Sequence, residues 1–214
     1  MNLKLPLVLF LFFALASCES AEERNIRVAQ KEQERIERKE RVIRRREEGQ
    51  RQAEQERERL TREREEKAIY DKYISNSLST GKLPYSYCFG ANQSCSGNRC
   101  SEIKVKTPNN SEVLVIIKQG GDVVRHAYIE AGSSLTFEVP NGTYQPFFYY
   151  GNGWNPEKVM KETDCGTLKG GFVADEQFGK DEPQYLSNNI LEYELIIQEQ
   201  GNFSTRPSSP NEAF

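Results

Sequence analysis

The sequence predicts a long charged α-helix followed by an all-β antiparallel sandwich of about seven strands. Two observations carry this prediction. Residues 21–75 are rich in Glu, Arg, Lys and Gln, with one glycine and no proline, whereas residues 76–205 alternate short apolar runs with Gly, Asn and Pro turns. The first composition favours a helix. The second, with β-branched and aromatic residues between turn signals, is typical of a sandwich or barrel.

The chain opens with an apolar run over residues 5–16. This run is too short to span a bilayer and fits a secretory signal, which we expect over residues 1–17. At its end, Leu15-Ala16-Ser17-Cys18 resembles the lipobox of bacterial lipoproteins. The resemblance implies a signal cut before Cys18, a lipid anchor on that cysteine and a short tether over residues 18–20. An ordinary cleaved signal followed by a chance cysteine is the alternative.

The same resemblance implies a membrane as the first partner. Several acyl chains on one residue anchor a protein firmly. In the enterobacterial family an aspartate after the cysteine favours the inner membrane, and here the residue is Glu19. We therefore expect a chain that is lipid-anchored at the outer membrane and faces the periplasm or the cell surface.

The charged segment over 21–75 is expected to form a helical stalk. Between Glu19 and Lys72 there are 16 acidic and 17 basic residues, and acids often precede bases by four positions, which adds a few tenths of a kcal/mol per pair. About fifty residues at ~1.5 Å each reach roughly 75 Å, so the helix would act as a spacer. The interleaved acids cancel most of the basic field, and we expect no nucleic-acid partner.

A continuous coiled-coil seam is absent from the stalk sequence. Ala29, Ile36 and Ile43 fall seven residues apart, but Gln50 and Arg57 continue the series. A seam needs apolar residues at a and d over several heptads. The sequence thus favours a monomer with a lone charged helix, and a weak helical dimer is the rival interpretation.

Short runs of apolar residues define the strands of the predicted sandwich. Residues 113–117 are apolar throughout and indicate a central strand, and residues 135–139 alternate apolar with polar, as a half-buried strand does. Asn141-Gly142 between two such runs favours a hairpin. The expected strands are 102–106, 112–118, 122–130, 134–139, 142–150, 171–175 and 190–198. We expect the tail over 206–214 to be disordered.

Four cysteines remain beyond the anchor, and they favour disulfides in an exported chain. They are Cys88, Cys95, Cys100 and Cys165. Three pairings are open; we favour one bridge within the loop over 88–100 and one that ties this loop to Cys165. A zinc site is the alternative, but the spacing lacks the close C-x2-C pair that such sites usually use.

Part of the sandwich resembles known secreted domains. Within "AGSSLTFEVPNGTYQPFFYY", Pro140, Gly142 and Tyr144 form the Pro-x-Gly-x-Tyr pattern of prealbumin-like sandwiches. The segments "PYSYCFG", "NGTYQPFFYYGNGWNP" and "FGKDEPQYL" resemble C-terminal modules of uncharacterised secreted proteins from Bacteroidetes-type bacteria. These resemblances imply a fold and no activity.

The aromatic stretch over 142–154 poses the main functional question. It carries rings at alternating positions on both sides of one strand, followed by a Gly-Asn-Gly turn. Amphipathic rings favour recognition surfaces, so one interpretation is a platform for a glycan or a surface protein. The other is that both faces are core and the tryptophan closes one end of the sandwich. The candidate ligand-binding residues are Tyr149, Tyr150, Asn152, Trp154 and Asn155.

No catalytic constellation accompanies these candidates. The single histidine, His126, lies in an expected strand, and no G-x-S-x-G sequence is present. We therefore predict no enzyme, cofactor or metal. The expected function is a membrane-anchored, non-catalytic binding module on a helical spacer. The alternative is a structural or assembly component of a cell-envelope complex that docks through the helix.

Overall fold

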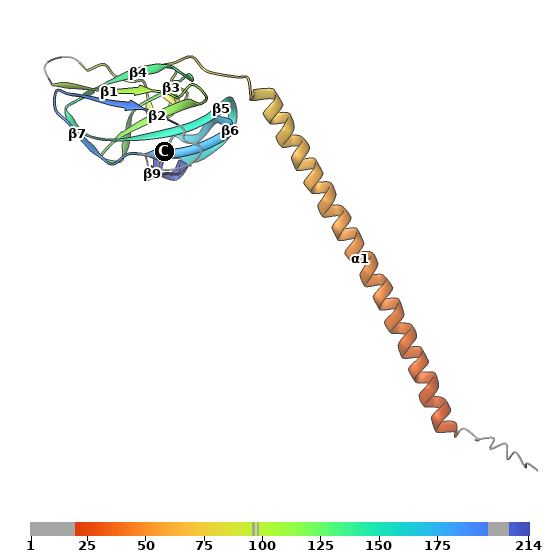
Figure 1. Ribbon diagram of the computed structural model, residues 1–214. Helices are drawn as coiled ribbons and strands as arrows, with labels where there is room; N and C mark the ends of the chain where they lie inside the picture. Colours follow the sequence, from red (N-terminus) through yellow and green to blue (C-terminus); the bar gives the residue numbers. More distant parts are fainter. Residues whose placement is uncertain (1–19, 96, 98, 197–205) are drawn as a thin grey trace, which may run out of the picture. The chain divides into compact units, whose positions relative to one another are not determined.

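The computed structural model describes residues 20–95, 97, 99–196 and 206–214 (Figure 1). The predicted signal peptide over 1–17 and the predicted lipidation site Cys18 lie outside these described residues. The chain divides into two compact units, Met1–Thr61 and Arg62–Phe214. We call the second the head unit and describe each unit separately.

Helix α1 runs over Ala21–Tyr73, as the composition predicts. A capping box begins it: the Ser20 amide donates to the Glu23 carboxylate at 2.9 Å, and the Glu23 amide donates to Ser20 Oγ at 3.2 Å. Every residue of the helix up to Lys72 is exposed, and only Tyr73 is buried. Among the described residues, no helix is long and apolar enough to cross a membrane. Local ion pairs such as Lys67 with Asp71, at 2.6 Å, add support along the exposed surface.

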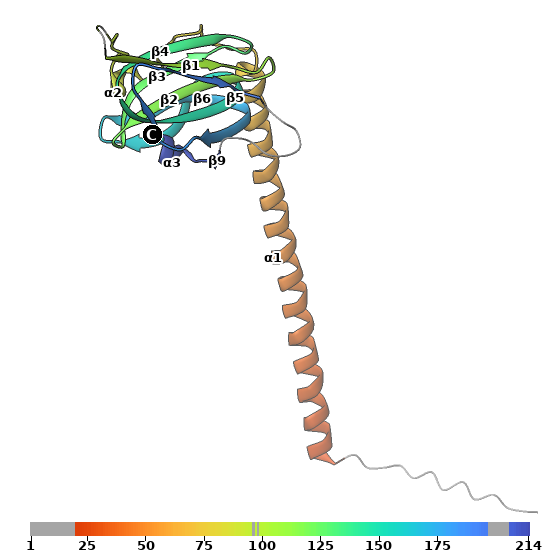
Figure 2. The same cartoon turned by 60° about the vertical axis from the view of Figure 1, so that its left-hand side comes forward.

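Two sheets form the sandwich that the sequence predicts (Figure 2). In the larger sheet β2 is central, between β3 and β5, and the order is β3-β2-β5-β6-β9 with β7 paired to β5. The smaller sheet has the order β4-β1-β8, and its β1–β8 pair is parallel. The strands are β1 Cys100–Lys106, β2 Glu112–Gln119, β3 Asp122–Ile129, β4 Ser134–Pro140, β5 Gly142–Thr163, β6 Gly166–Lys180, β7 Gln184–Leu186, β8 Ile190–Glu194 and β9 Arg206–Pro207.

The larger sheet is buried on both faces. Val113, Val115 and Ile117 of β2 point into an interior core between the two sheets. Leu114 and Ile116, on the opposite face of the same strand, belong to an outer core. The outer core is covered by the segment after α1, by helix α2 (Ser86–Phe89) and by helix α3 (Pro210–Ala213), which lies below the larger sheet in Figure 2. Side chains along β2 alternate between the two cores, so this strand is apolar on both faces.

Strand β5 does not end where the sequence predicts. The expected turn at Gly151-Asn152-Gly153 is wrong, because the strand continues to Thr163 with a register shift after Tyr150. A Cβ on Gly151 would lie 2.3 Å from Phe172 Cβ, and one on Gly153 would lie 2.6 Å from Ile74 Cα. These glycines therefore permit close packing of the chain at a bulge.

The C-terminal residues correct a second prediction. Residues 206–214 were expected to be disordered, but Arg206–Pro207 pairs with β6 and α3 packs on the larger sheet. Ala213 is fully buried, and the Phe214 ring lies 5.1 Å from that of Tyr85. Although this segment has few apolar residues, Ala213 and Phe214 pack in the outer core and order it. The local sequence gives no sign of that contact.

Two disulfides confirm the pattern favoured from the sequence. Cys95 pairs with Cys100 within the loop, and Cys88 pairs with Cys165, which joins α2 to the β5–β6 connection. Their Cα atoms are 5.9 and 5.4 Å apart, within the usual range. The second bridge spans 77 residues and fixes the cover of the outer core to the sheet beneath it.

Candidate functional site

The predicted aromatic platform is not a surface. Tyr149 is 0%, Tyr150 4% and Trp154 2% exposed, so these rings belong to the two cores and the prediction of a recognition face at these residues is wrong. Tyr150 faces the interior core, whereas Tyr149 and Trp154 lie in the outer core. Aromatics stand on both sides of β5 because the larger sheet is covered on both sides.

Trp154 is held at the centre of an aromatic cluster. Its ring meets those of Tyr128 and Phe172 edge to face, with centroids 5.6 and 5.3 Å apart. Such edge-to-face pairs add to the stabilisation from burial. Its amide donates to the Asn76 carbonyl at 2.7 Å, which pairs the chain just after α1 with β5. Trp154 is therefore a core residue, as the alternative interpretation expected, but it lies in the outer core of the larger sheet and does not close an end of the sandwich.

The two candidate asparagines make local hydrogen bonds. Asn152 Nδ2 donates to Asp175 Oδ2 at 2.9 Å, across β5 and β6. Asn155 is buried, and its Oδ1 accepts from the Glu157 amide at 2.9 Å. Each side chain thus stabilises the bulged part of β5, and the structure does not bring the five predicted binding residues together in one site.

His126 is a core residue under α2. It is 1% exposed, its ring stacks on Tyr85 at 6.3 Å and meets Phe89 edge to face at 5.7 Å. Burial lowers the pKa of His126 to about 4, so the imidazole is neutral at pH 7. Within the described part of the chain, its Nε2 atom has no hydrogen-bond partner. A buried neutral ring among aromatics is placed for packing rather than for proton transfer.

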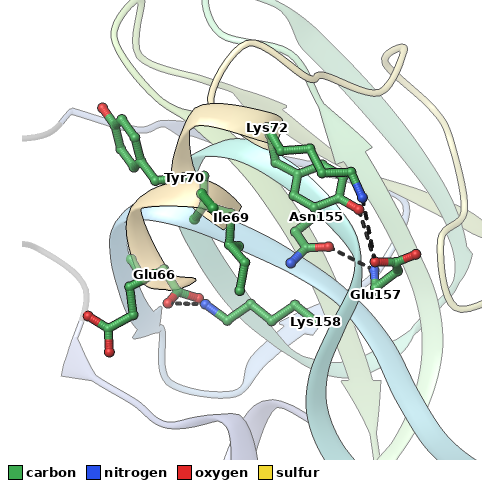
Figure 3. A pocket seen from close by; sticks show the side chains of 11 residues that line it. Glu66, Ile69, Tyr70, Lys72, Asn155, Glu157 and Lys158 are labelled. Atoms are coloured by element: carbon green, nitrogen blue, oxygen red, sulfur yellow. Dashed lines mark hydrogen bonds and ion pairs between the residues drawn. The ribbon is translucent and has the colours of Figure 1, made fainter. Parts of the chain in front are cut away.

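A groove of about 840 Å³ lies within the head unit, between the last turns of α1 and the β5–β6 hairpin (Figure 3). We call it the junction groove. Figure 3 shows Ile69 and Lys158 directed into it, while Tyr70 points away. On its far wall, Tyr73 Oη donates to Glu157 Oε2 at 3.0 Å, and Lys72 Nζ lies 3.9 Å from the same oxygen. These contacts join the end of α1 to β5.

Glu176, another carboxylate that lines the junction groove, contacts both a tyrosine and a lysine. Glu176 accepts a hydrogen bond from the Tyr149 hydroxyl through Oε1 and forms an ion pair with Lys158 through Oε2. The same Lys158 Nζ donates to the Phe172 carbonyl at 2.7 Å, and the Phe172 amide donates to Tyr149 Oη at 2.8 Å. Burial, and then Glu176, raise the pKa of Tyr149 well above its ordinary value.

This arrangement suits a structural connection better than a reaction centre. Glu157 and Glu176 are each bonded to a tyrosine hydroxyl and lie beside a lysine, so both carboxylates take part in contacts that hold the groove together. In the part of the chain that the structure describes, no group of three or more His, Cys, Asp or Glu side chains is placed to hold a metal ion. The junction groove therefore gives no support to a catalytic function.

A second groove, of about 590 Å³, contains the residues that sequence reasoning missed. Tyr87, Lys82 and Lys169 line it, and Tyr87 is 56% exposed. Tyr87 precedes Cys88, which is bonded to Cys165, and its hydroxyl is held by the Thr167 carbonyl and the Lys169 amide. The groove joins residues more than eighty positions apart, which no local pattern predicts.

Neither a family model, nor a curated protein, nor a solved structure matches this chain.

Proposed function

We propose that this protein is a lipid-anchored, non-catalytic binding module. In this proposal a lipid on Cys18 holds the chain on the outer membrane, α1 is a spacer, and the β-sandwich recognises a glycan or surface protein. The exposure of α1 carries the proposal, because every described residue from Ser20 to Lys72 is exposed. A helix that buries no apolar face along this length suits a solvent-spanning connection.

The length and the end of α1 support the spacer. Its 53 residues at ~1.5 Å each extend about 80 Å if the helix is straight. Its last turns, from Arg62, belong to the head unit, where Tyr73 is buried and bonded to Glu157. The C-terminal end of α1 is therefore part of the packed head unit.

The anchor is tested by lipid labelling. We would produce the full chain in a Gram-negative bacterium with labelled palmitate, beside Cys18→Ser. The native chain is expected to carry the label and to sediment with membranes, and Cys18→Ser is expected to do neither. Equal labelling of both chains, or of neither, would contradict the anchor.

The spacer is tested by distance from the membrane. A peptide tag inserted at Gly120-Gly121, an open turn, would carry a donor dye, and the vesicle membrane an acceptor. Energy transfer is expected to be low for the native chain and to rise when residues 28–55 are deleted, because 28 helical residues shorten the spacer by about 40 Å. Transfer that does not change on deletion would exclude a spacer.

A matched control separates the spacer from the assembly component. Residues 28–55 would be replaced by an unrelated charged helical sequence of equal length. A spacer needs only length, so the replaced chain is expected to keep both low energy transfer and any native binding. Loss of an envelope complex that co-purifies with the native chain would instead favour docking through the helix surface.

A further inference from the structure

We infer that the groove around Tyr87 binds an acidic saccharide, through stacking on the Tyr87 ring and ion pairing with Lys82 and Lys169. This inference rests on the proposed binding function and names its site and its ligand class. It moves the recognition surface from the buried rings of β5 to a different ring, carried by α2.

Tyr87 is both exposed and fixed, which is the first argument. Its hydroxyl donates to the Thr167 carbonyl at 3.2 Å and accepts from the Lys169 amide at 2.9 Å. Its neighbour Cys88 is bonded to Cys165. A ring held at both ends loses little conformational freedom when a ligand stacks on it, which removes a common cost of binding.

The walls of the groove match one face of a sugar ring. Leu78, Pro84 and Pro156 line it beside Tyr87, and the buried Trp154 forms part of its floor. A pyranose presents C–H groups on one face and hydroxyl groups at its rim, and amphipathic aromatic rings suit such a surface. Binding sites are commonly apolar with a few polar groups that fix orientation.

The charge of the groove indicates that the ligand is acidic. Beyond Lys72 the chain has 16 acidic and 11 basic residues, a formal net charge of −5, yet Lys82 and Lys169 are the charged residues that line this groove. Among the described residues neither Lys82 nor Lys169 forms an ion pair. Glu162 lies nearby but does not line the groove, and its carboxylate is bonded to Thr167 Oγ1.

The backbone argues against an extended peptide. Peptides that add to a sheet edge need free backbone groups on that edge. Here the Thr167 carbonyl and the Lys169 amide are both occupied by the Tyr87 hydroxyl. The ring face and the two ammonium groups are what remains for a ligand, and these suit a sugar that carries a carboxylate.

The test uses the full chain and two saccharides of equal length. We would titrate oligogalacturonate and neutral oligogalactose by calorimetry, at low and at physiological salt. The acidic oligomer is expected to bind at least tenfold more tightly, with an affinity that falls as salt rises. Equal binding of both oligomers, or binding of neither, would overturn the inference.

Variants locate the site. Tyr87→Ala is expected to weaken oligogalacturonate binding at least tenfold, and Lys82→Gln and Lys169→Gln several-fold each. Tyr185→Ala, at a tyrosine that is 73% exposed on β7, and Lys104→Gln, at a lysine paired with Glu192, are the matched controls and should bind like the native chain. Thermal melts verify that each variant folds. Native-like binding by folded Tyr87→Ala would overturn the inference.

Two further outcomes distinguish the possibilities. An acidic proline-containing peptide that binds more tightly than oligogalacturonate, and that loses binding in Tyr87→Ala, would replace the saccharide with a peptide partner. Because lipid labelling and energy transfer need no ligand, a lipidated spacer without saccharide binding would overturn this inference alone. A head that binds oligogalacturonate on a chain without a lipid would overturn only the anchor.

Discussion

The long helix and the head unit obtain their stability in opposite ways. Along α1 the side chains from Ala21 to Lys72 are exposed, and the helix relies on residue propensity, a capping box and local ion pairs. In the head unit, two cores lie on the two faces of one sheet, and strands from distant parts of the sequence form them. In the head unit, the effect of a substitution on stability should therefore depend on how buried the replaced side chain is. In the helix, it should depend on the helix propensity of the new residue.

The largest effect is expected from the interior core. Phe148 is fully buried on β5, and Phe148→Ala should lower the free energy of unfolding of the head by about 3–5 kcal/mol through lost burial and a cavity. Chemical denaturation followed by the fluorescence of the single tryptophan measures this. Ile43→Ala on the exposed helix is the control and should shift the same transition by less than about 0.5 kcal/mol. Similar changes in the free energy of unfolding for Phe148→Ala and Ile43→Ala would show that burial does not separate the two regions.

The disulfide that closes the outer core should come next. Replacing Cys88 and Cys165 with serine is expected to cost about 2–5 kcal/mol, because this bridge restricts a 77-residue separation in the unfolded chain. Replacing Cys95 and Cys100, which are five residues apart, should cost less. Thermal melts of the two double variants give the comparison. An equal or larger loss for the short loop would show that loop length does not decide the effect.

The buried histidine should make the head, and not the helix, sensitive to mild acid. Burial lowers the pKa of His126 to about 4, and the unfolded chain protonates near 6.5. Between these values the unfolded state binds more protons, so stability falls as the pH falls, by about 3 kcal/mol in all. Denaturation at several pH values from 7 to 4.5 measures the slope.

His126→Phe is the control for this slope. Phenylalanine fits a site between the rings of Tyr85 and Phe89 and does not titrate. Since His126 is the single histidine, the difference in slope between the two chains isolates its contribution. A slope that is unchanged in His126→Phe would mean that other groups cause the acid sensitivity.

The smallest effect is expected on the helix. Gly49 is exposed, and a Cβ added there meets nothing within 4 Å. Gly49→Ala should stabilise the surrounding turns by about 1 kcal/mol, since glycine is a poor helix former. Amide hydrogen exchange around residue 49 detects this as slower exchange, whereas the melting of the head should not change. Faster amide exchange in Gly49→Ala would show that glycine stabilises the helix at this position, contrary to its low helix propensity.

How far the sequence predicts the head depends on the kind of pattern. Strands β2, β3 and β4 were predicted within two residues, because their apolar runs are bounded by turn residues. The end of β5 was not, because Gly151 and Gly153 are required for close packing against Phe172 and Ile74, and a tight turn uses the same residue type. The prediction of a recognition surface at Tyr149, Tyr150 and Trp154 was wrong for a similar reason. Alternation shows which side of a strand a residue faces, but not whether another part of the chain covers that side.

The sequence by itself determined the properties that depend on neighbours along the chain. These are the helix of Ala21–Tyr73, the class of the head and the even set of cysteines. The tertiary structure alone decided that Trp154 is core, that Phe214 fills the outer core and that Tyr87 lies beside Lys169. Helix propensity and turn preference act within a few residues. Burial depends on contacts between segments that can lie more than a hundred residues apart, as Tyr85 and Phe214 do, and those contacts exist only once the sheets have formed.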